Sequence, residues 1–355
     1  MTTIDKTKPV MVTGATGYIA GWLIKQLVED GLTVHAAVRN PADEKKLAHL
    51  NALVKGTNGK IVYFKSDLLT PGSYAEAMKD CELVFHLASP FILDVKNPQR
   101  DLIDPALLGT ANVLDAVNKT SSVKRVVLTS SCAAIYTDAI DCLSAKGGIL
   151  TEENWNTTSS LEYQPYSYSK TLAEKKAWEI VGQQSRWDLV TINPSLVMGP
   201  MLDAKGTTSE SLNILKQIGD GTMKSGVPEM GIGLVDVRDV ANAHFLAGFT
   251  PTAKGRYITS GYNTNFFEMA LALQPKYGKD FPIPKNKLPK WLLMLIGPMV
   301  NKQLTRKYIK NNVGIDWKAD NSKIKKELGI SFRPMTQTME DAFQVLVDEK
   351  ILLPR

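Results

Sequence analysis

Short apolar runs alternate with helix-like stretches through the first 200 residues, and this rhythm constrains the fold more than any other feature of the chain. The runs have the length of strands, are apolar on both faces, and lie at residues 10–13, 34–38, 61–64, 83–87, 126–129 and 189–192. Such strands are typical of a parallel sheet that helices cover on both sides. The stretches with helical spacing are residues 18–30, 101–118 and 171–181. The sequence therefore predicts an α/β fold built on a doubly wound parallel sheet.

The rhythm changes after residue 200. Residues 206–226 and 251–289 are rich in glycine, proline, serine, threonine and asparagine, with shorter elements between them. We therefore expect residues 1–200 to form the sheet domain and residues 201–355 to form mainly a smaller substrate lobe. Residues 232–250 again have the pattern of a strand and a helix, and we expect them to dock back onto the sheet domain.

A glycine turn joins the first apolar run to the first helical stretch. It reads TGATGYIAG at residues 13–21, with Gly14 and Gly17 at the turn. Glycines permit a tight turn and let a pyrophosphate approach the backbone, and the helix N-terminus offers free N–H groups and positive partial charge. The spacing G-x-x-G-x-x-A differs by one residue from G-x-G-x-x-G, but it has the required strand before it and helix after it. The sequence thus predicts a dinucleotide site in a Rossmann fold, the alternative being a purely structural turn.

The end of the second apolar run indicates which dinucleotide binds. An NAD site places an acid about twenty residues past the glycines, where it binds the ribose 2′-hydroxyl. Residues 37–40 read AVRN here, with no acid and with Arg39. A guanidinium suits a 2′-phosphate, and Lys46 adds positive charge unless it only forms a solvated helix face. The sequence therefore predicts NADP(H) rather than NAD(H).

Tyr166 and Lys170 form a Y-x-x-x-K pair just before the stretch at 171–181. Side chains at i and i+4 share a helix face, and an ammonium favours the phenolate form of a neighbouring tyrosine. Such a tyrosine can exchange a proton with a carbonyl or alcohol oxygen while hydride moves at a nicotinamide. Hydroxyls at residues 129–131 follow the fifth run, and ligands in open sheets bind at the carboxyl ends of the strands. A chain of this composition is expected to contain about one Y-x-x-x-K pair by chance. The evidence for a functional pair is therefore its position in the predicted fold.

These motifs together resemble the extended short-chain dehydrogenase/reductase family. The chain is most similar to its dihydroflavonol reductase, cinnamoyl-CoA reductase and methylglyoxal (aldehyde) reductase branch. The likeness covers about residues 9–345, and the segments that support it are LASPF at 87–91, RVVLTSS at 125–131, YSKTLAE at 168–174, NPSLVMGP at 193–200, VDVRDV at 235–240 and residues 321–329. The resemblance implies an NADPH-dependent carbonyl reductase.

The resemblance also implies roles for individual residues. Ser131 would be the catalytic serine and Ser130 structural, while Tyr166 would donate the proton and Lys170 would activate it. Phe91 and Tyr136, with the lobe around residues 200–230, would face a small carbonyl substrate. The turn, the arginine and the resemblance together give the cofactor contacts as Gly14, Thr16, Gly17, Tyr18, Ile19, Arg39, Lys46, Asp67, Leu68, Leu87, Ala88, Ser89, Thr129, Tyr166, Lys170, Pro194, Val197 and Ser209.

Two departures from the family's motifs bear on the substrate. Cinnamoyl-CoA reductases carry an N-W-Y-C-Y-G-K type motif around the tyrosine, whereas this chain has QPYSYSK at 164–170, which argues against a CoA thioester. Dihydroflavonol reductases tend to have asparagine where Tyr136 aligns, which argues against a flavonoid. A generic aldehyde or ketone is the prediction. The alternatives are a sugar-nucleotide epimerase/dehydratase or a hydroxysteroid dehydrogenase, and a non-catalytic NADP(H) sensor.

Composition and charge narrow the remaining classes. Apolar residues make up 44% and charged residues 22%, as in ordinary globular proteins. The net charge of +6 equals that of residues 301–326 alone, which we interpret as a solvated helical face rather than a nucleic-acid or membrane surface. Three cysteines and no secretory signal favour a reducing, cytoplasmic setting, and the four histidines lack metal-ligand spacing. The apolar run at 291–300 is too short to cross a bilayer. The segment 281–312 around it would be either a lid over the substrate site or the core of the lobe. We expect a monomer or homodimer.

Overall fold

The computed structural model describes residues 1–89, 95–206, 209–300 and 303–355. Within these residues the largest sheet has seven strands, all parallel, in the order β10-β6-β5-β4-β1-β2-β3. Strands β1 to β6 lie in the order β3-β2-β1-β4-β5-β6, which is that of a doubly wound dinucleotide fold and confirms the predicted fold class. The strands are β1 (Val10–Thr13), β2 (Thr33–Val38), β3 (Lys60–Lys65), β4 (Leu83–His86), β5 (Arg125–Thr129), β6 (Asp188–Pro194) and β10 (Gly255–Thr259).

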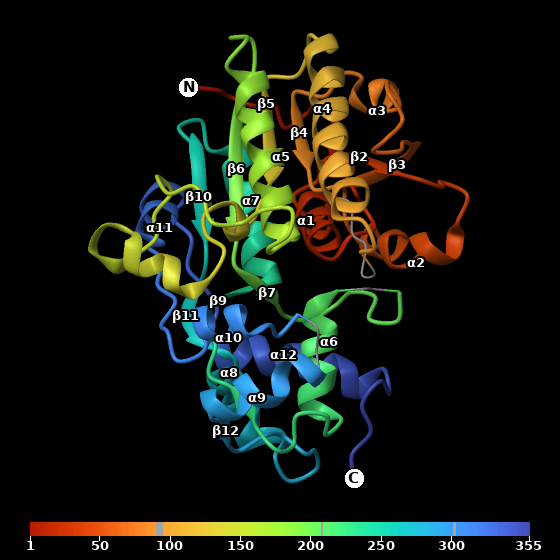
Figure 1. The fold of residues 1–355 in the computed structure, drawn as a ribbon. Coiled ribbons are helices and arrows are strands. Elements are labelled where there is room, and N and C mark those ends of the chain that lie inside the picture. Colours follow the sequence, from red (N-terminus) through yellow and green to blue (C-terminus); the bar gives the residue numbers. More distant parts are fainter. Residues whose placement is uncertain (90–94, 207–208, 301–302) are drawn as a thin grey trace.

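Helices cover both faces of this sheet (Figure 1). Val10 and Val12 of β1 pack in one buried cluster with helices α1 (Tyr18–Glu29) and α7 (Val237–Phe249). Met11, which points to the opposite face, packs with α3 (Ala75–Met78), α4 (Asp104–Lys119) and α5 (Pro165–Val181). This alternation is why the strands are apolar on both faces. Helix α2 (Glu44–Leu53) lies beside α1 and contributes buried leucines to the first cluster.

A smaller lobe lies against the carboxyl end of the sheet (Figure 1). Its core joins helices α6 (Glu210–Gly219), α8 (Phe266–Tyr277) and α12 (Met335–Asp348). Short strands β7 (Leu196–Met198), β9 (Gly231–Asp236) and β11 (Tyr262–Asn265) form a second sheet, and β8 (Val227–Pro228) pairs with β12 (Lys287–Leu288). Helices α9 (Lys290–Val300) and α10 (Arg306–Asn312) also pack in this lobe, and helix α11 (Ser322–Leu328) follows them in the chain.

Parts of the later chain return to the sheet domain. Helix α7 packs on α1, where Gln26 donates to Asn242 at 3.0 Å. Strand β10 pairs with β6 as the seventh strand, and Ile324 and Leu328 of α11 join the same buried cluster. The sequence reading did not place β10 or α11 on the sheet domain. The division of the chain into domains by residue number remains a prediction.

Helix α5 begins earlier than the sequence pattern indicated. It starts at Pro165 instead of residue 171, so Tyr166 and Lys170 lie inside its first turns. Pro165 occupies a position at which proline is favoured, because the first helical residue needs no N–H partner. Gln164 precedes it in the left-handed region, at φ 55°.

The described residues also show how far the chain meets the requirements of a membrane span, a metal site and a disulfide bond. No described helix combines the length and apolar character that a membrane crossing requires. The described side chains include no group of three or more histidine, cysteine, aspartate or glutamate residues that could hold a metal ion. Cys81, Cys132 and Cys142 are free and buried, and burial raises the pKa of each thiol.

Candidate active site

The glycine turn lies where β1 ends and α1 begins. Gly14 has φ +63°, and a Cβ added there would lie 2.9 Å from the Cα of Ala88. Only glycine fits both the backbone conformation and the close approach. Gly17 precedes α1, and no side chain caps that helix or places an acid in its first turn. The N-terminal amides of α1 are therefore available to an anion such as a pyrophosphate.

A buried hydrogen-bond chain holds the end of β4 against the turn. The N–H of Ala88 donates to the hydroxyl oxygen of Thr13 at 2.9 Å, and that hydroxyl lies 2.9 Å from Nδ1 of His86. Because Thr13 accepts from Ala88, its own proton is placed toward His86. Burial, with a contribution from the positive charge of Lys170, lowers the pKa of His86 to about 3. His86 is therefore a neutral acceptor at physiological pH, and this fixes the backbone that faces Gly14.

The two serines that follow β5 have different partners. The buried Ser130 donates to Oε2 of Glu174 at 2.5 Å. Ser131 is only half-buried, and its Oγ accepts the N–H of Ala133 at 3.1 Å as it begins a short 3-10 turn (Cys132–Ala134). The hydroxyl proton of Ser130 is thus donated to a carboxylate. The hydroxyl oxygen of Ser131 only accepts a hydrogen bond in its contact with Ala133, so its proton can be donated to a substrate. This difference supports Ser131, rather than Ser130, as the serine that meets a substrate oxygen.

Tyr166 and Lys170 lie one turn apart at the start of α5. Tyr166 is 48% exposed, so its phenol is accessible to a substrate. The ammonium of Lys170 lies 5.8 Å from the ring centre of Tyr166 and donates to the hydroxyl of Ser89 at 2.9 Å. The lysine therefore bridges the tyrosine's helix and the residue after Ala88. A small cavity of about 20 Å³ lies beside it, lined by residues that include His86, Ser89, Thr129, Ser130, Lys170 and Glu174.

The predicted adenine-side residues lie at the ends of β2 and β3. Arg39 is exposed just after β2, and Lys46 is exposed in the first turns of α2. Asp67 shapes the turn after β3 by accepting the N–H of Leu69 at 2.9 Å. Leu68 packs so close to α4 that a Cβ on Gly109 would lie 2.5 Å from it. These residues share one edge of the sheet with the glycine turn, because parallel strands end at the same edge.

Several predicted cofactor residues have their polar side-chain groups engaged by the protein. The phenol of Tyr18 donates to the carbonyl of Gly199 at 2.7 Å, and burial raises its pKa. The hydroxyl of Thr129 lies 2.6 Å from Nε2 of His244. Ser209 caps α6 by accepting the N–H of Leu212 at 3.2 Å. Of the others, Thr16, Ile19, Leu87 and Val197 are half-buried near the turn and the strand ends, and Pro194 is buried at the end of β6. Their contacts with a cofactor remain predictions.

The two predicted substrate residues are Tyr136 and Phe91. Tyr136 packs on Trp317, with ring centres 5.4 Å apart, and burial raises its pKa well above the usual range. This packing places its ring in a buried cluster with Cys132 and Ile135, and a substrate contact stays a prediction. Phe91 lies outside the described residues.

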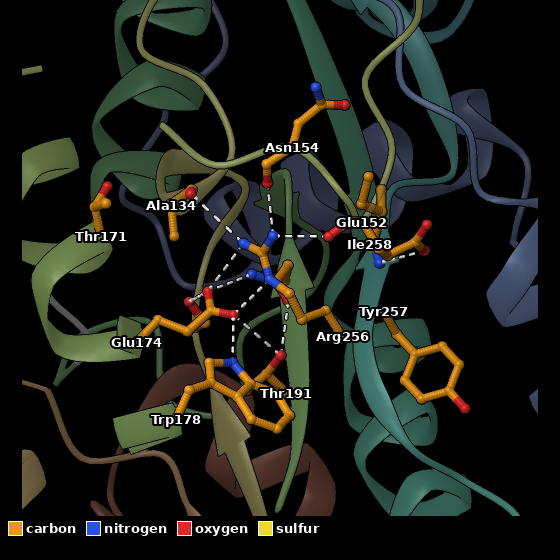
Figure 2. Close-up of polar contacts among 12 residues, drawn as sticks. Ala134, Glu152, Asn154, Thr171, Glu174, Trp178, Thr191, Arg256, Tyr257 and Ile258 are labelled. Atoms are coloured by element: carbon orange, nitrogen blue, oxygen red, sulfur yellow. Dashed lines mark hydrogen bonds and ion pairs between the residues drawn. The ribbon is translucent and has the colours of Figure 1, made fainter. Parts of the chain in front are cut away.

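The sequence reading gave no role to Glu174, Arg256 or Asn193, which meet beneath the site. Glu174 and Arg256 form a buried ion pair, with Nε 2.7 Å from Oε1 (Figure 2). Asn193 donates to Oε2 of Glu174 at 2.8 Å and to the carbonyl of Ser131 at 3.2 Å. One signal was in the sequence, since Glu174 follows Tyr166 and Lys170 at the same four-residue spacing.

The residues at this edge fit a dinucleotide. The left-handed Gly14, its close approach to Ala88, the uncapped start of α1 and the exposed Arg39 are the features a bound pyrophosphate and a ribose phosphate require. The carboxyl ends of β4, β5 and β6 lie side by side at this edge, and Ser131 comes just after β5. The fold and the site together define a nucleotide-dependent enzyme of the extended Rossmann type.

Comparison with known proteins agrees with this class. The model of the NAD dependent epimerase/dehydratase family matches residues 10–258. A cinnamoyl-CoA reductase of Medicago truncatula is 42% identical over 273 residues, covering 76% of this chain and 80% of that protein. A tetraketide alpha-pyrone reductase of Arabidopsis thaliana is 34% identical over 355 residues, covering 98% of each. The structure of yeast methylglyoxal/isovaleraldehyde reductase complexed with NADPH has a TM-score of 0.75 and 26% identity, covering 96% of this chain and 99% of that one.

The chain therefore belongs to the NAD dependent epimerase/dehydratase family. This confirms the resemblance to extended short-chain dehydrogenases/reductases. It also makes the chain an oxidoreductase that uses a nicotinamide cofactor, NAD(P)(H).

Proposed function

We propose that the protein is an NADPH-dependent reductase of small aldehydes or ketones, with Tyr166 as proton donor. The observation that carries the proposal is the contact between Lys170 and Ser89, which holds the lysine between the exposed Tyr166 and the end of β4 beside the glycine turn. An acid and a cofactor edge in one place are what reduction of a carbonyl requires.

Arg39 supports NADPH over NADH. It is exposed at the end of β2, where an NAD site would place an acid, and its guanidinium can pair with a 2′-phosphate. The yeast reductase compared above is complexed with NADPH, and the two plant relatives are reductases by name.

The nicotinamide, when bound, supplies the hydride that reaches the carbonyl carbon. Ser131 donates a hydrogen bond to the carbonyl oxygen and polarises it. Tyr166 transfers its phenolic proton to that oxygen as the alcohol forms. Lys170 stabilises the resulting phenolate by its charge, and its contact with Ser89 keeps it in place. Gly14, Gly17 and the start of α1 would hold the pyrophosphate.

The test follows NADPH oxidation by absorbance across a panel of aliphatic and aromatic aldehydes and ketones, with NADH in parallel. Turnover of several carbonyls with NADPH, and much slower turnover with NADH, is the expected result. A protein that purifies with NAD already bound and reduces none of the panel would instead be an epimerase. NADPH binding without turnover on any carbonyl would contradict the reductase proposal and favour the sensor.

A further inference from the structure

Glu174 continues the helix face that carries Tyr166 and Lys170. The three residues are spaced four apart on α5, so their side chains lie along one stripe of the helix. Tyr166 is exposed and Lys170 half-buried, whereas Glu174 is buried, 1% exposed. Lys170 and Glu174 line the same small cavity with Ser130. The stripe thus runs from solvent, through the site, into the core.

The two oxygens of the Glu174 carboxylate serve different parts of the fold. Oε1 accepts from Arg256 Nε at 2.7 Å, Trp178 Nε1 at 3.2 Å and Thr191 Oγ1 at 3.3 Å. Figure 2 shows Glu174 among these three side chains. Oε2 accepts from Ser130 Oγ at 2.5 Å, from Asn193 Nδ2 at 2.8 Å and, over a longer distance, from Arg256 Nη2 at 3.4 Å. Arg256 thus contacts both oxygens, but the two short contacts of Oε2 come from residues at the ends of β5 and β6.

The Oε2 contacts lead directly to Ser131. Ser130 is its neighbour in the chain, so the bond from Ser130 fixes one end of the shared peptide unit. Asn193 uses the same amide nitrogen to donate to Glu174 and to the carbonyl of Ser131 at 3.2 Å. The backbone of Ser131 is thus held on both sides through one carboxylate that belongs to the helix of Tyr166 and Lys170.

Arg256 holds the carboxylate in this orientation. It comes from β10, and besides Glu174 it donates to the carbonyls of Glu152 at 2.8 Å and Asn154 at 2.6 Å. Its guanidinium carbon lies 3.9 Å from the ring centre of Trp155. A buried ion pair often contributes little net stability, because desolvation offsets the attraction. The role of this ion pair is therefore more easily explained by the orientation that it gives Glu174 than by a gain in stability.

We propose that Glu174, held by Arg256, is a positioning residue that sets Ser131 relative to Tyr166 and Lys170. This inference rests on the proposed function, since it assigns a role in that reaction. Glu174 touches neither substrate nor cofactor. It acts through Ser130 and Asn193, and it links β5 and β6 to α5 so that the serine and the tyrosine reach one carbonyl oxygen together.

The test compares two variants that each remove one donor from this carboxylate. Ser130→Ala deletes a donor to Oε2, and Trp178→Phe deletes a donor to Oε1. Glu174 keeps its other donors in both, so both variants are expected to fold. Ser130→Ala should lower kcat about 10- to 100-fold with little change in KM or in the Kd for NADPH, because misplacement of one group slows only the chemical step. Trp178→Phe should keep kcat within about twofold of the unchanged protein.

Two further variants sharpen the comparison. Ser130→Thr restores a hydroxyl and should recover most of the kcat that Ser130→Ala loses. If the two variants have the same melting temperature, a difference in stability cannot account for the recovery. Glu174→Gln, which leaves Arg256 without its carboxylate, should lower kcat and also lower the melting temperature. If this last variant does not fold, the serine and tryptophan variants still decide the question.

A structural readout separates this proposal from the reductase proposal. In crystal structures of the two variants, Ser131 Oγ should shift relative to Lys170 Nζ in Ser130→Ala and stay in place in Trp178→Phe. An unmoved Ser131 in Ser130→Ala, or an equal loss of kcat in both variants, would overturn the positioning role. A protein without carbonyl turnover would refute the proposed function, and the two crystal structures would still show whether Glu174 sets Ser131.

Discussion

The ammonium of Lys170 donates to the hydroxyl of Ser89 at 2.9 Å and so joins helix α5 to the end of strand β4. The residue before Ser89 is Ala88, whose backbone faces Gly14 and donates to Thr13. Two adjacent residues therefore hold the glycine turn on one side and the lysine of the Y-x-x-x-K pair on the other. The glycine turn proposed to bind the cofactor and the helix proposed to carry the proton donor are joined through this one short segment.

Tyr166→Phe should lower kcat by about 10²- to 10⁴-fold, because it removes the proton that the carbonyl oxygen receives. The Kd for NADPH should change little, since the rest of the edge is unaltered. Steady-state kinetics with a reactive aldehyde and fluorescence titration of NADPH measure the two quantities. Tyr168→Phe makes the same chemical change two residues along the same helix and should leave kcat near its original value. Comparable activity in both variants would refute the role of Tyr166.

Arg39→Ala should weaken NADPH binding by about 10- to 100-fold, the value of a charge-assisted hydrogen bond to a phosphate. Binding of NADH should be almost unchanged, because NADH has no 2′-phosphate to lose. Lys45→Ala removes one positive charge from the exposed face of α2 and serves as the matched control. Equal weakening of both cofactors by Arg39→Ala would mean that this arginine does not read the phosphate.

The sheet could be predicted from the sequence because most of its strands are buried on both faces, β3 at the edge being only partly buried. That burial makes the runs at residues 10–13 and 83–87 predominantly apolar, and the observed strands agree with them to within one residue. Strand β10 was missed because its partner β6 lies far away in the chain. Its sequence, GRYIT, is also not a continuous apolar run, and it lies within residues 251–289, whose composition pointed to the smaller lobe. The start of α5 was missed because YSYSK has no apolar periodicity, although Pro165 marked it.

The candidate site was predictable only where its residues are close in the chain. Gly14 and Gly17, or Tyr166 and Lys170, form local patterns whose chemistry follows from spacing. The partnership of Glu174 with Arg256 joins residues 82 positions apart, and no local pattern encodes it. The contrast between Ser130 and Ser131 is likewise visible only once Glu174 is placed beside one of them.

Gly14→Ala should destabilise the protein and abolish tight cofactor binding. The left-handed φ of +63° costs an alanine about 1–2 kcal/mol, and the new Cβ would also meet the backbone of Ala88 at 2.9 Å. Gly31→Ala is the matched control, because Gly31 has φ +83° but nothing within 4 Å of an added Cβ. Gly31→Ala should lose only the stability that the left-handed backbone conformation costs, and it should bind NADPH normally. Thermal melting and NADPH titration compare the two, and equal effects would contradict a special role for the contact with Ala88.

Acid should destabilise the fold through its buried histidines before most carboxylates protonate. Burial lowers the pKa of His86 to about 3 and that of His244 to about 4, against 6.5 for an exposed histidine. His244 lies between the hydroxyl of Thr129 and the carbonyl of Val240. Below pH 6.5 the unfolded chain binds more protons than the folded one, so the free energy of unfolding falls as the pH falls.

Between about pH 7 and pH 5.5 the two histidines should together cost about 2 kcal/mol of unfolding free energy. Urea denaturation at these two values measures the loss. His244→Gln keeps an acceptor for Thr129 but cannot bind a proton in this range, so it should reduce the loss by about half. The pKa values of Glu152 and Asp239 are raised by burial and act in the opposite direction, chiefly at lower pH, which is why the measurement stops at about pH 5.5. A free energy of unfolding that stays constant over this interval would show that the histidines are charged in the folded protein. The conclusion that His86 is neutral beside Lys170 would then be wrong.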